Sequence, residues 1–183
     1  GSDVALVSRS GSAVPRDVVL TSLELPTHLP VIAQVGGIVP WKGHQVTAEA
    51  CVNLARSGRA FSLLILGSGA PAFISSLWAI LGAIPGHRDR VRIVEFRPDD
   101  YSLLSAADIV VHPSVLPDPL PNAVREAMIL GKPVIGSNAV AVKSAATFRA
   151  RNDNYVVGCV HGLQIAEKCS QTISENRHMI CRI

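Results

Sequence analysis

Residues 105–136 read SAADIVVHPSVLPDPLPNAVREAMILGKPVIG. The stretch contains two short apolar runs, 108–112 and 133–136. Between them lie a proline-rich loop and a helical pattern that opens at Pro121-Asn122, runs to Leu130 and stops at Gly131, a usual helix-terminating residue. A nearly continuous apolar run is typical of a strand that is buried on both faces of a parallel sheet. The stretch therefore predicts strand, loop, helix and parallel strand in that order.

The same alternation extends towards the amino terminus. Further apolar runs of strand length occupy Val31–Val35, Ser62–Leu66 and Val91–Phe96. Helical patterns between the runs occupy Gln45–Arg56, a segment with Pro71 in its first turn, and a segment opened by Asp99 and Asp100. Alternating strands and helices predict an α/β fold, a single Rossmann-like domain whose parallel sheet carries helices on both faces. Ligands of such sheets bind at the carboxyl ends of the strands, so the loops there are the candidate site.

The chain divides into three regions. We expect an N-terminal linker or edge segment at 1–28, the Rossmann-like domain at 29–138, and a divergent, partly helical tail at 139–183. The outer candidate elements are an edge strand at Val4–Val7 or Val18–Leu20, a tail strand at Tyr155–Val160 and a tail helix from Leu163 to about Arg177.

Composition excludes several classes of protein. Of the 183 residues, 48% are apolar and 17% charged, so the chain is not disordered by composition. Aromatic residues make up only 4%, and residues 1–138 carry equal numbers of basic and acidic side chains, which leaves the net charge of +3 in the tail. A broad nucleic-acid-binding face is therefore not expected.

Two further patterns bear on location. The four cysteines show neither zinc-ligand spacing nor the density of a disulfide scaffold, which favours a cytoplasmic protein, with peripheral association at the membrane as the alternative. Residues 60–86 carry no charge and are long enough to span a bilayer. Their glycines and prolines favour a buried strand, a turn and a packed helix instead, so no integral membrane span is expected.

Three loops contain residues suited to binding chemistry. Lys42 follows Gly36 and Gly37 and precedes a helix start, where a cation can meet an anion; an ordinary turn with a solvated lysine is the alternative. The segment 67–72 resembles a dinucleotide fingerprint without its third glycine, and a tight strand–helix turn is the plainer interpretation. Asp118 and Glu126 flank the amides of 120–123, an arrangement that suits a sugar nucleotide, although a capping group and a surface charge would also explain the two carboxylates.

Taken together, these motifs resemble a known family. From about Leu29 to Asn138 the chain is similar to the C-terminal, donor nucleotide-sugar-binding domain of GT-B fold glycosyltransferases, specifically the family-4 (group 1) retaining enzymes. The segments that carry the resemblance are 35–43, 64–69, 96–100, 105–114, 118–126 and 127–135.

The resemblance implies roles for particular residues. Asp118 and Glu126 would be the catalytic pair, with Asp118 touching the donor sugar and Glu126 the ribose hydroxyls. Lys42 would neutralise the donor diphosphate. The residues that would bind the donor are Gly36, Gly37, Lys42, Phe96, Arg97, Leu120, Pro121, Asn122, Ala123 and Glu126. The resemblance implies no metal, because in the family a lysine, an arginine and the helix end stabilise the departing diphosphate. It implies no cofactor, because the nucleotide sugar, with UDP or GDP as its nucleotide, is a substrate.

The chain also departs from the family pattern. Gly37 stands where the family has a phosphate-binding arginine, Asp118 replaces a glutamate, and the family continuation after Asn138 is not recognisable. We therefore expect a donor domain that is inactive alone and needs a separate acceptor-binding domain. The alternatives are a truncated or frame-altered fragment acting through assembly as a homodimer, and a dinucleotide-dependent oxidoreductase. His112 is expected to be a structural histidine, and His44 is given no role.

Overall fold

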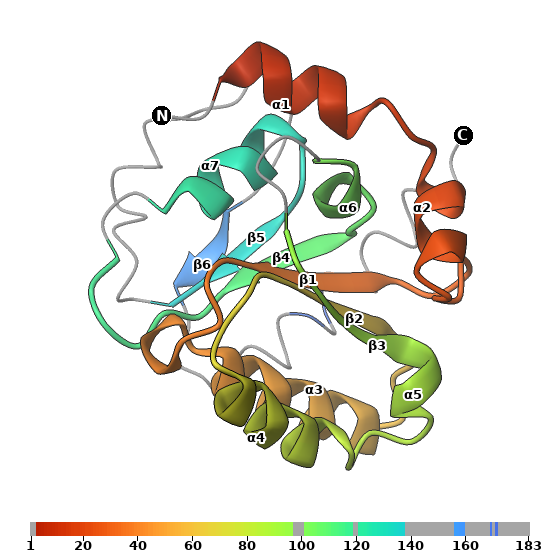
Figure 1. The fold of residues 1–183 in the computed structure, drawn as a ribbon, viewed down its shortest axis with the longest axis vertical. Coiled ribbons are helices and arrows are strands. Elements are labelled where there is room, and N and C mark those ends of the chain that lie inside the picture. Colours follow the sequence, from red (N-terminus) through yellow and green to blue (C-terminus); the bar gives the residue numbers. More distant parts are fainter. Residues whose placement is uncertain are drawn as a thin grey trace.

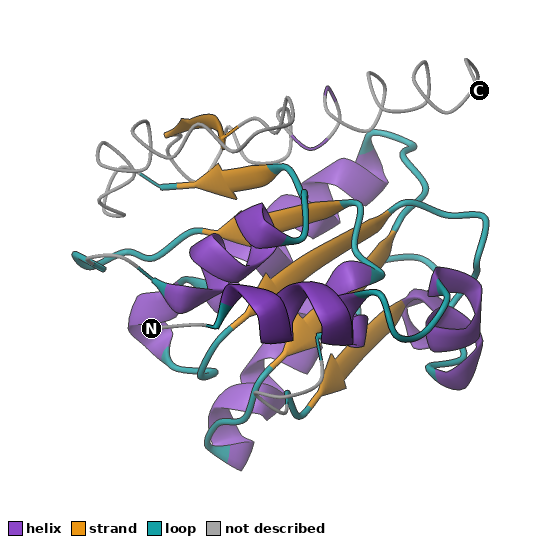
Figure 2. Cartoon of the chain, turned by 90° about the horizontal axis from the view of Figure 1, so that it is seen from above, coloured by secondary structure: helices purple, strands orange, loops and turns teal. Residues whose placement is uncertain are grey.

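The computed structural model describes residues 3–96, 101–118, 121–137, 156–159, 169 and 171. Within these ranges six strands form one sheet in the order β3-β2-β1-β4-β5-β6. Every neighbouring pair is parallel, and the arrows in Figure 2 accordingly point the same way. The strands are β1 (Val31–Val35), β2 (Ser62–Leu66), β3 (Val91–Val94), β4 (Ile109–His112), β5 (Val134–Gly136) and β6 (Val156–Cys159).

Helices cover both faces of the sheet, which confirms the predicted fold class. The helices are α1 (Val4–Gly11), α2 (Arg16–Ser22), α3 (His44–Arg56), α4 (Pro71–Leu81), α5 (His87–Arg90), α6 (Ser102–Ser105) and α7 (Asn122–Ile129), with a short 3₁₀ turn, η1 (Pro40–Lys42). Figure 1 shows α3 and α4 on one face and α1, α2, α6 and α7 on the other.

The apolar runs produce this sheet because both of its faces are buried. All five residues of β1 and of β2 are buried. Successive side chains of a strand point to opposite faces, so Leu63 and Ile65 pack in the core beneath α3 and α4. Leu64 and Leu66 pack in the core of the opposite layer. Neither face needs polar residues, which is why the pattern is continuous rather than alternating.

Most predicted elements are confirmed. The bounds of β1 and β2 agree with the prediction, α3 begins one residue early, and α7 ends beside Gly131, whose φ of +72° suits glycine. The tail strand predicted at Tyr155–Val160 is confirmed as β6. It pairs with β5, so the edge of β5 is covered. The helix start at 99–100 lies outside the described residues. So does most of the tail helix, although Cys169 and Gln171 have helical backbone.

The N-terminal prediction was wrong. Residues 4–11 and 16–22 are helices rather than an edge strand or linker. The Asp3 side chain caps the first of them by accepting from two backbone amides of the first turn. Val7, Val19 and Leu20 are buried, so this segment is part of the layered fold.

Arg16 ties the N-terminal segment to the sheet. Its guanidinium donates to the carbonyl oxygens of Thr27 and Leu29 and to Oδ2 of Asp108 at 3.0 Å. The same Oδ2 accepts from the amide of Val31 at 2.7 Å, at the start of β1. One cluster therefore joins α2, the approach to β1 and the turn before β4.

Replacing Arg16 with methionine should lower the free energy of unfolding by about 1 kcal/mol, because it removes hydrogen bonds to a charged and two neutral acceptors that are partly screened by solvent. Chemical denaturation would measure the change. Arg9→Met removes an exposed cation from α1 and serves as the matched control. Equal stability of the two variants would contradict the role given to Arg16.

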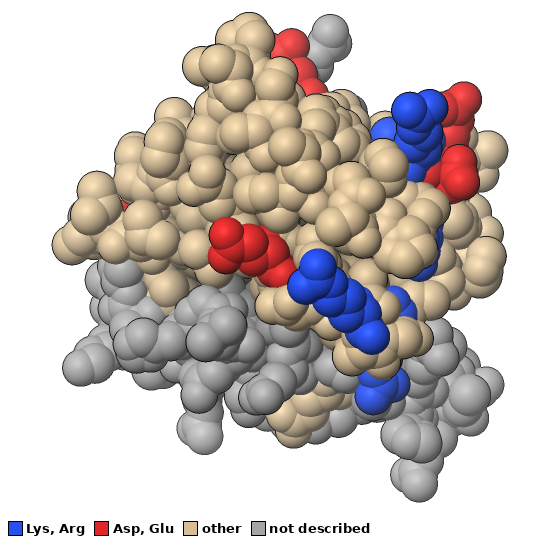
Figure 3. All heavy atoms as spheres, turned by 90° about the horizontal axis from the view of Figure 1, so that it is seen from below, with Lys and Arg blue, Asp and Glu red and all other residues tan. Residues whose placement is uncertain are grey.

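The surface agrees with the composition. Figure 3 shows the face formed by α3 and α4, where the few charged side chains are scattered and most of the described surface is uncharged. The uncharged stretch 60–86 forms β2, a turn and α4. None of the helices that the structure describes is both long and apolar enough to cross a bilayer.

Candidate functional site

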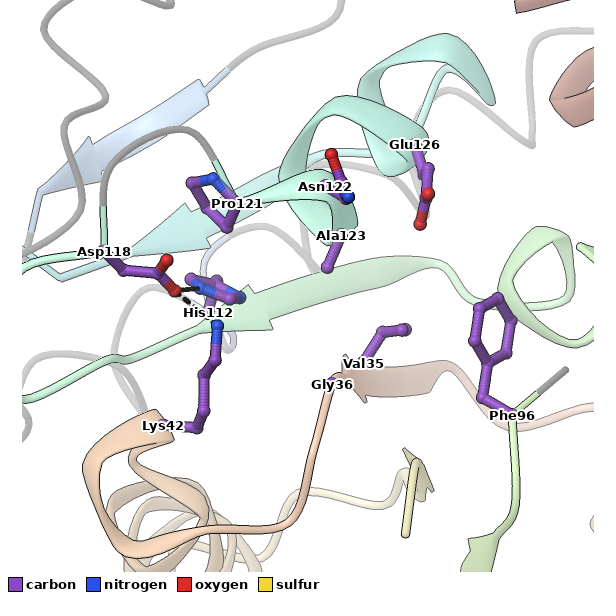
Figure 4. A pocket seen from close by; sticks show the side chains of 10 residues that line it. All are labelled: Val35, Gly36, Lys42, Phe96, His112, Asp118, Pro121, Asn122, Ala123 and Glu126. Atoms are coloured by element: carbon purple, nitrogen blue, oxygen red, sulfur yellow. Dashed lines mark hydrogen bonds and ion pairs between the residues drawn. The ribbon is translucent and has the colours of Figure 1, made fainter. Parts of the chain in front are cut away.

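The candidate site lies between β1 and β4, where the order of strands in the sheet changes direction. From β1 the chain proceeds to β2 and β3 on one side, whereas β4, β5 and β6 lie on the other. Such a switch point opens a crevice at the carboxyl ends of the two central strands. A cavity of about 460 Å³ occupies this place, a size typical of small-molecule sites. Its lining consists of Val35, Gly36, Lys42, Phe96, His112, Asp118, Pro121, Asn122, Ala123 and Glu126 (Figure 4).

The loop after β1 positions Lys42. η1 ends at Lys42, and Gly43 follows it with a φ of +75°, which is unfavourable for other residues. A side chain on Gly43 would also overlap the carbonyl oxygen of Pro113. Gln34, buried in β1, donates from Nε2 to the carbonyl of Lys42 at 3.0 Å. The ammonium lies 4.4 Å from the ring centroid of Trp41, a cation–π contact. Backbone and side-chain contacts thus fix the lysine at the cavity.

The loop after β4 brings a carboxylate to the lysine. Asp118 Oδ2 lies 2.6 Å from Lys42 Nζ and 2.8 Å from His112 Nε2. Ser114 Oγ donates to the same oxygen at 3.2 Å. The loops are joined further by the amide of Val115, which donates to the Trp41 carbonyl oxygen. A charge cluster, Lys42, Asp118 and His112, therefore occupies one end of the cavity (Figure 4).

Burial and charge set the protonation of this cluster. Burial alone would raise the pKa of Asp118, but hydrogen bonds from Lys42 and His112 outweigh it and hold that pKa below its usual range. Burial lowers the pKa of His112 despite its hydrogen bond to Asp118. Near neutral pH Asp118 is therefore ionised and the imidazole of His112 is neutral.

Helix α7 supplies the next part of the lining. Its first residues, Asn122 and Ala123, face the cavity behind Pro121, and no side chain caps the helix. Uncapped amides at a helix start favour an anion. One turn further on, Glu126 is 8% exposed and accepts a hydrogen bond from the hydroxyl of Tyr101 at 3.3 Å.

Phe96 lies at the far end of the cavity and packs against Tyr101. Phe96 and Tyr101 meet edge to face with ring centroids 5.8 Å apart. In Figure 4 Phe96 lies on the Glu126 side of the cavity, away from Lys42 and Asp118. One end of the cavity therefore carries the Lys42–Asp118 ion pair, and the other has a carboxylate beside an aromatic ring.

The structure brings most of the predicted site residues together. Gly36, Lys42, Phe96, Asp118, Pro121, Asn122, Ala123 and Glu126 all line the cavity. Gly37 is not among the lining residues, although a side chain there would meet open space. Arg97 and Leu120 lie outside the described residues.

Sequence reasoning missed three residues of the site. His112 was expected to be only structural, yet it lines the cavity and bonds Asp118. Ser114 and Tyr101 each contact one of the two carboxylates. The sole signal was the position of His112 at the carboxyl end of a strand; its contact with Asp118 depends on the path of the intervening loop.

The glycines of 67–72 have a structural explanation. A side chain on Gly67 would overlap the carbonyl oxygen of Gly36, and one on Gly69 would overlap that of Ile38. The loop instead pairs with the loop after β1, where the Ile38 amide donates to the Ser68 carbonyl oxygen. These glycines permit close packing of two loops and contribute nothing to the cavity lining, which favours the plainer interpretation.

The described residues form no recognisable metal-binding site. Among them, no three His, Cys, Asp or Glu side chains gather in a way that could hold a metal ion. The thiols of Cys51 and Cys169 are free and buried. Absence of a metal from the chemistry stays a prediction.

His44 makes the fold sensitive to acid. Its side chain is fully buried at the start of α3, and burial lowers its pKa to about 4, assisted by the nearby His112 and Lys42. An unfolded histidine binds a proton near pH 6.5, so the unfolded state gains protons first on acidification. This contribution to stability is complete above about pH 6.5 and is lost progressively towards pH 4.

Replacing His44 with glutamine should therefore flatten the fall in stability between about pH 6.5 and 4. Urea unfolding at several pH values would measure the slope. His28→Gln, at an exposed histidine, should leave the slope unchanged. An identical slope in wild type and His44→Gln would contradict the prediction.

Comparison with known proteins identifies the family. The model of the family "Glycosyl transferases group 1" matches residues 29–175. The chain belongs to the group 1 glycosyltransferases. The match continues to residue 175, so the resemblance extends beyond Asn138, where the sequence analysis ended it.

Two curated relatives come from Streptomyces kanamyceticus. A 2-deoxystreptamine glucosyltransferase is 36% identical over 107 residues, which cover 57% of this group 1 chain and 27% of the relative. An alpha-D-kanosaminyltransferase is 33% identical over 115 residues, which cover 62% of this chain and 29% of the relative. The chain thus spans less than a third of the length of these relatives.

Solved structures share the fold. A glycosyltransferase from Rickettsia africae superposes with a TM-score of 0.76 at 21% identity, covering 95% of this chain and 45% of that one. Anabaena HepE in complex with UDP-glucose superposes with a TM-score of 0.75 at 22% identity, covering 97% of this chain and 47% of HepE. The C-terminal domain of the group 1 protein LpcC from Francisella tularensis gives 0.71 at 23% identity and is covered over 90% of its length. The chain therefore has the fold of a part of these glycosyltransferases, under half the length of the first two.

Proposed function

We propose that this chain is the donor-binding half of a group 1 glycosyltransferase and that the cavity between β1 and β4 holds a nucleotide diphosphate sugar. The observation that carries the proposal is the order of groups along the cavity. Lys42 and Asp118 lie at one end, the start of α7 in the middle, and Glu126 with Phe96 at the other. A sugar nucleotide presents sugar, diphosphate, ribose and base in a matching order.

Each group suits one part of such a ligand. The ammonium of Lys42 has three N–H donors, so it can contact a diphosphate while still bonding Asp118. The uncapped amides of α7 favour the same negative charge. Glu126 can accept hydrogen bonds from ribose hydroxyls, and the ring of Phe96 can contact the base. Arg97 and Leu120 are proposed to belong to the same site.

The reaction proposed is transfer of the sugar to an acceptor. Positive charge from Lys42 and the helix start would stabilise the departing diphosphate, in the absence of a metal. Transfer also needs an acceptor held close to the sugar. Because the chain spans under a third of its curated relatives, we propose that a separate acceptor-binding domain supplies this, and that the 183-residue chain alone transfers sugar very slowly.

Support for a UDP-linked donor comes from a neighbour. The superposed Anabaena HepE was crystallised with UDP-glucose, and one curated relative is named a glucosyltransferase. GDP-linked donors fit the same diphosphate and ribose contacts, so the base has to be decided by experiment.

Calorimetric titration of the 183-residue chain with UDP, GDP and NAD tests the proposal. Saturable binding of one diphosphate, with no binding of NAD, is the expected result. Absence of binding by either diphosphate at millimolar concentration would overturn the donor assignment. A preference for NAD would instead revive a dinucleotide-dependent function.

A further inference from the structure

The two oxygens of the Asp118 carboxylate have different surroundings. Oδ2 receives three donors: Lys42 Nζ at 2.6 Å, His112 Nε2 at 2.8 Å and Ser114 Oγ at 3.2 Å. Oδ1 accepts no hydrogen bond from the described residues, although Asp118 lines the cavity. Figure 4 shows this second oxygen turned away from Lys42 and His112. One oxygen is clamped and the other is left for a ligand.

The three donors to Oδ2 come from two loops. His112 is the last residue of β4 and is 2% exposed, and Ser114 is fully buried. The carbonyl oxygens of both residues accept hydrogen bonds from Ser137, which follows β5. Lys42 reaches the same oxygen from the other loop, the one after β1. His112 and Ser114 therefore orient the carboxylate from its own loop, and the lysine adds the third donor.

The protonation of His112 suits it to this task. A carboxylate oxygen accepts hydrogen bonds, so Nε2 carries the hydrogen that is donated to Asp118. His112 Nδ1 is buried and has no hydrogen-bond partner among the described residues. Burial also lowers the pKa of His112, which keeps the ring neutral near pH 7. The histidine is thus a fixed neutral donor rather than a second charge competing with Lys42 for the ligand.

We propose that His112 and Ser114 are positioning residues that hold Oδ2 of Asp118 so that Oδ1 accepts a hydrogen bond from a hydroxyl of the donor sugar. The inference rests on the proposed function and adds a basis for selecting the sugar. Without the two donors the carboxylate can rotate about its Cβ–Cγ bond, and neither oxygen is directed at the sugar. Contacts to the diphosphate, which belong to Lys42 and α7, do not change.

The test compares a nucleotide with its sugar-bearing form. Dissociation constants for UDP, and for whichever of UDP-glucose, UDP-galactose and UDP-N-acetylglucosamine the wild type binds most tightly, are measured by calorimetry. GDP and GDP-mannose replace them if the wild type prefers guanine. The ratio of the sugar nucleotide's constant to that of the nucleotide isolates the sugar contact.

His112→Phe keeps a ring and removes the donor. It should raise this ratio about tenfold, the effect of losing a well-aligned hydrogen bond to a charged group. Binding of UDP itself should change less than about threefold, because Lys42 and α7 remain. His112→Gln places an amide N–H near the position of Nε2 and should restore the ratio. Ser114→Ala should shift the ratio in the same direction by a smaller factor, and His28→Phe, at an exposed site, should not shift it.

The outcomes separate this inference from the proposed function. An unchanged ratio in His112→Phe and Ser114→Ala would overturn the positioning role while leaving nucleotide binding intact. Equal weakening of both ligands, with a lower melting temperature, would assign His112 a purely structural role and also overturn it. If His112→Phe does not fold, the ratio measured for Ser114→Ala still decides the question. Failure of the wild type to bind any nucleotide would remove the proposed function itself.

Discussion

Lys42→Met should weaken binding of UDP about thirtyfold, because a charge-assisted hydrogen bond to an anion contributes roughly 1.5–3 kcal/mol and 1.4 kcal/mol corresponds to a factor of ten. Lys42 is the cation that lines the described cavity, and its side chain is 18% exposed, so solvent screens it only partly. Uridine, which lacks the diphosphate, should bind wild type and variant alike. Calorimetry for UDP and an NMR titration for uridine would measure the two effects.

The lysine variant has two controls. Arg59→Met removes an exposed cation just before β2, at the amino ends of the strands and away from the cavity. It should leave UDP binding unchanged. Lys42→Arg keeps the charge and should retain most of the affinity. Wild-type affinity for UDP in Lys42→Met would remove the lysine from the site. A parallel loss for uridine and UDP would mean that the substitution had disturbed the cavity as a whole.

Glu126→Gln should weaken binding of UDP about tenfold. A carboxylate accepts hydrogen bonds from both ribose hydroxyls, whereas an amide offers one acceptor oxygen, and hydrogen bonds to charged groups are the stronger ones. Glutamine has the size of glutamate and can still accept from Tyr101, so the fold should persist. Calorimetric titration with UDP measures the effect.

The ligand itself supplies the sharper control for Glu126. A 2′,3′-dideoxy form of UDP lacks both hydroxyls and should bind wild type and Glu126→Gln with similar, weak affinity. Glu49→Gln, at an exposed glutamate of α3, should bind UDP as the wild type does. If the variant lost the same factor for UDP and for its dideoxy form, Glu126 would not contact the ribose.

The comparison of sequence with structure is instructive at the N-terminus. Apolar runs identified the inner strands because burial on both faces leaves a continuous pattern that few other structures produce. Residues 4–22 contain only two short apolar runs, 4–7 and 18–20, which were misassigned as an edge strand or linker. The signals for their helices were Asp3 at a cap position and the apolar side chains of Val19 and Leu20, which are buried in the structure. Both signals are weak when the sheet against which the helices pack is not known.

The sequence by itself determined the α/β class, the inner strands, the edge of the sheet that carries the site, and Lys42, Asp118 and Glu126 as its charged residues. Chain direction and hydrophobic period suffice for the class, the strands and the edge, since both are local properties. The three charged residues were chosen from their loops and from the family resemblance. Only the tertiary structure decided that three donors converge on one oxygen of Asp118 and that His112 is among them. That arrangement depends on how two loops, 70 residues apart in the chain, pack across the switch point between β1 and β4 (Gly43 against Pro113), and no local pattern encodes such a contact.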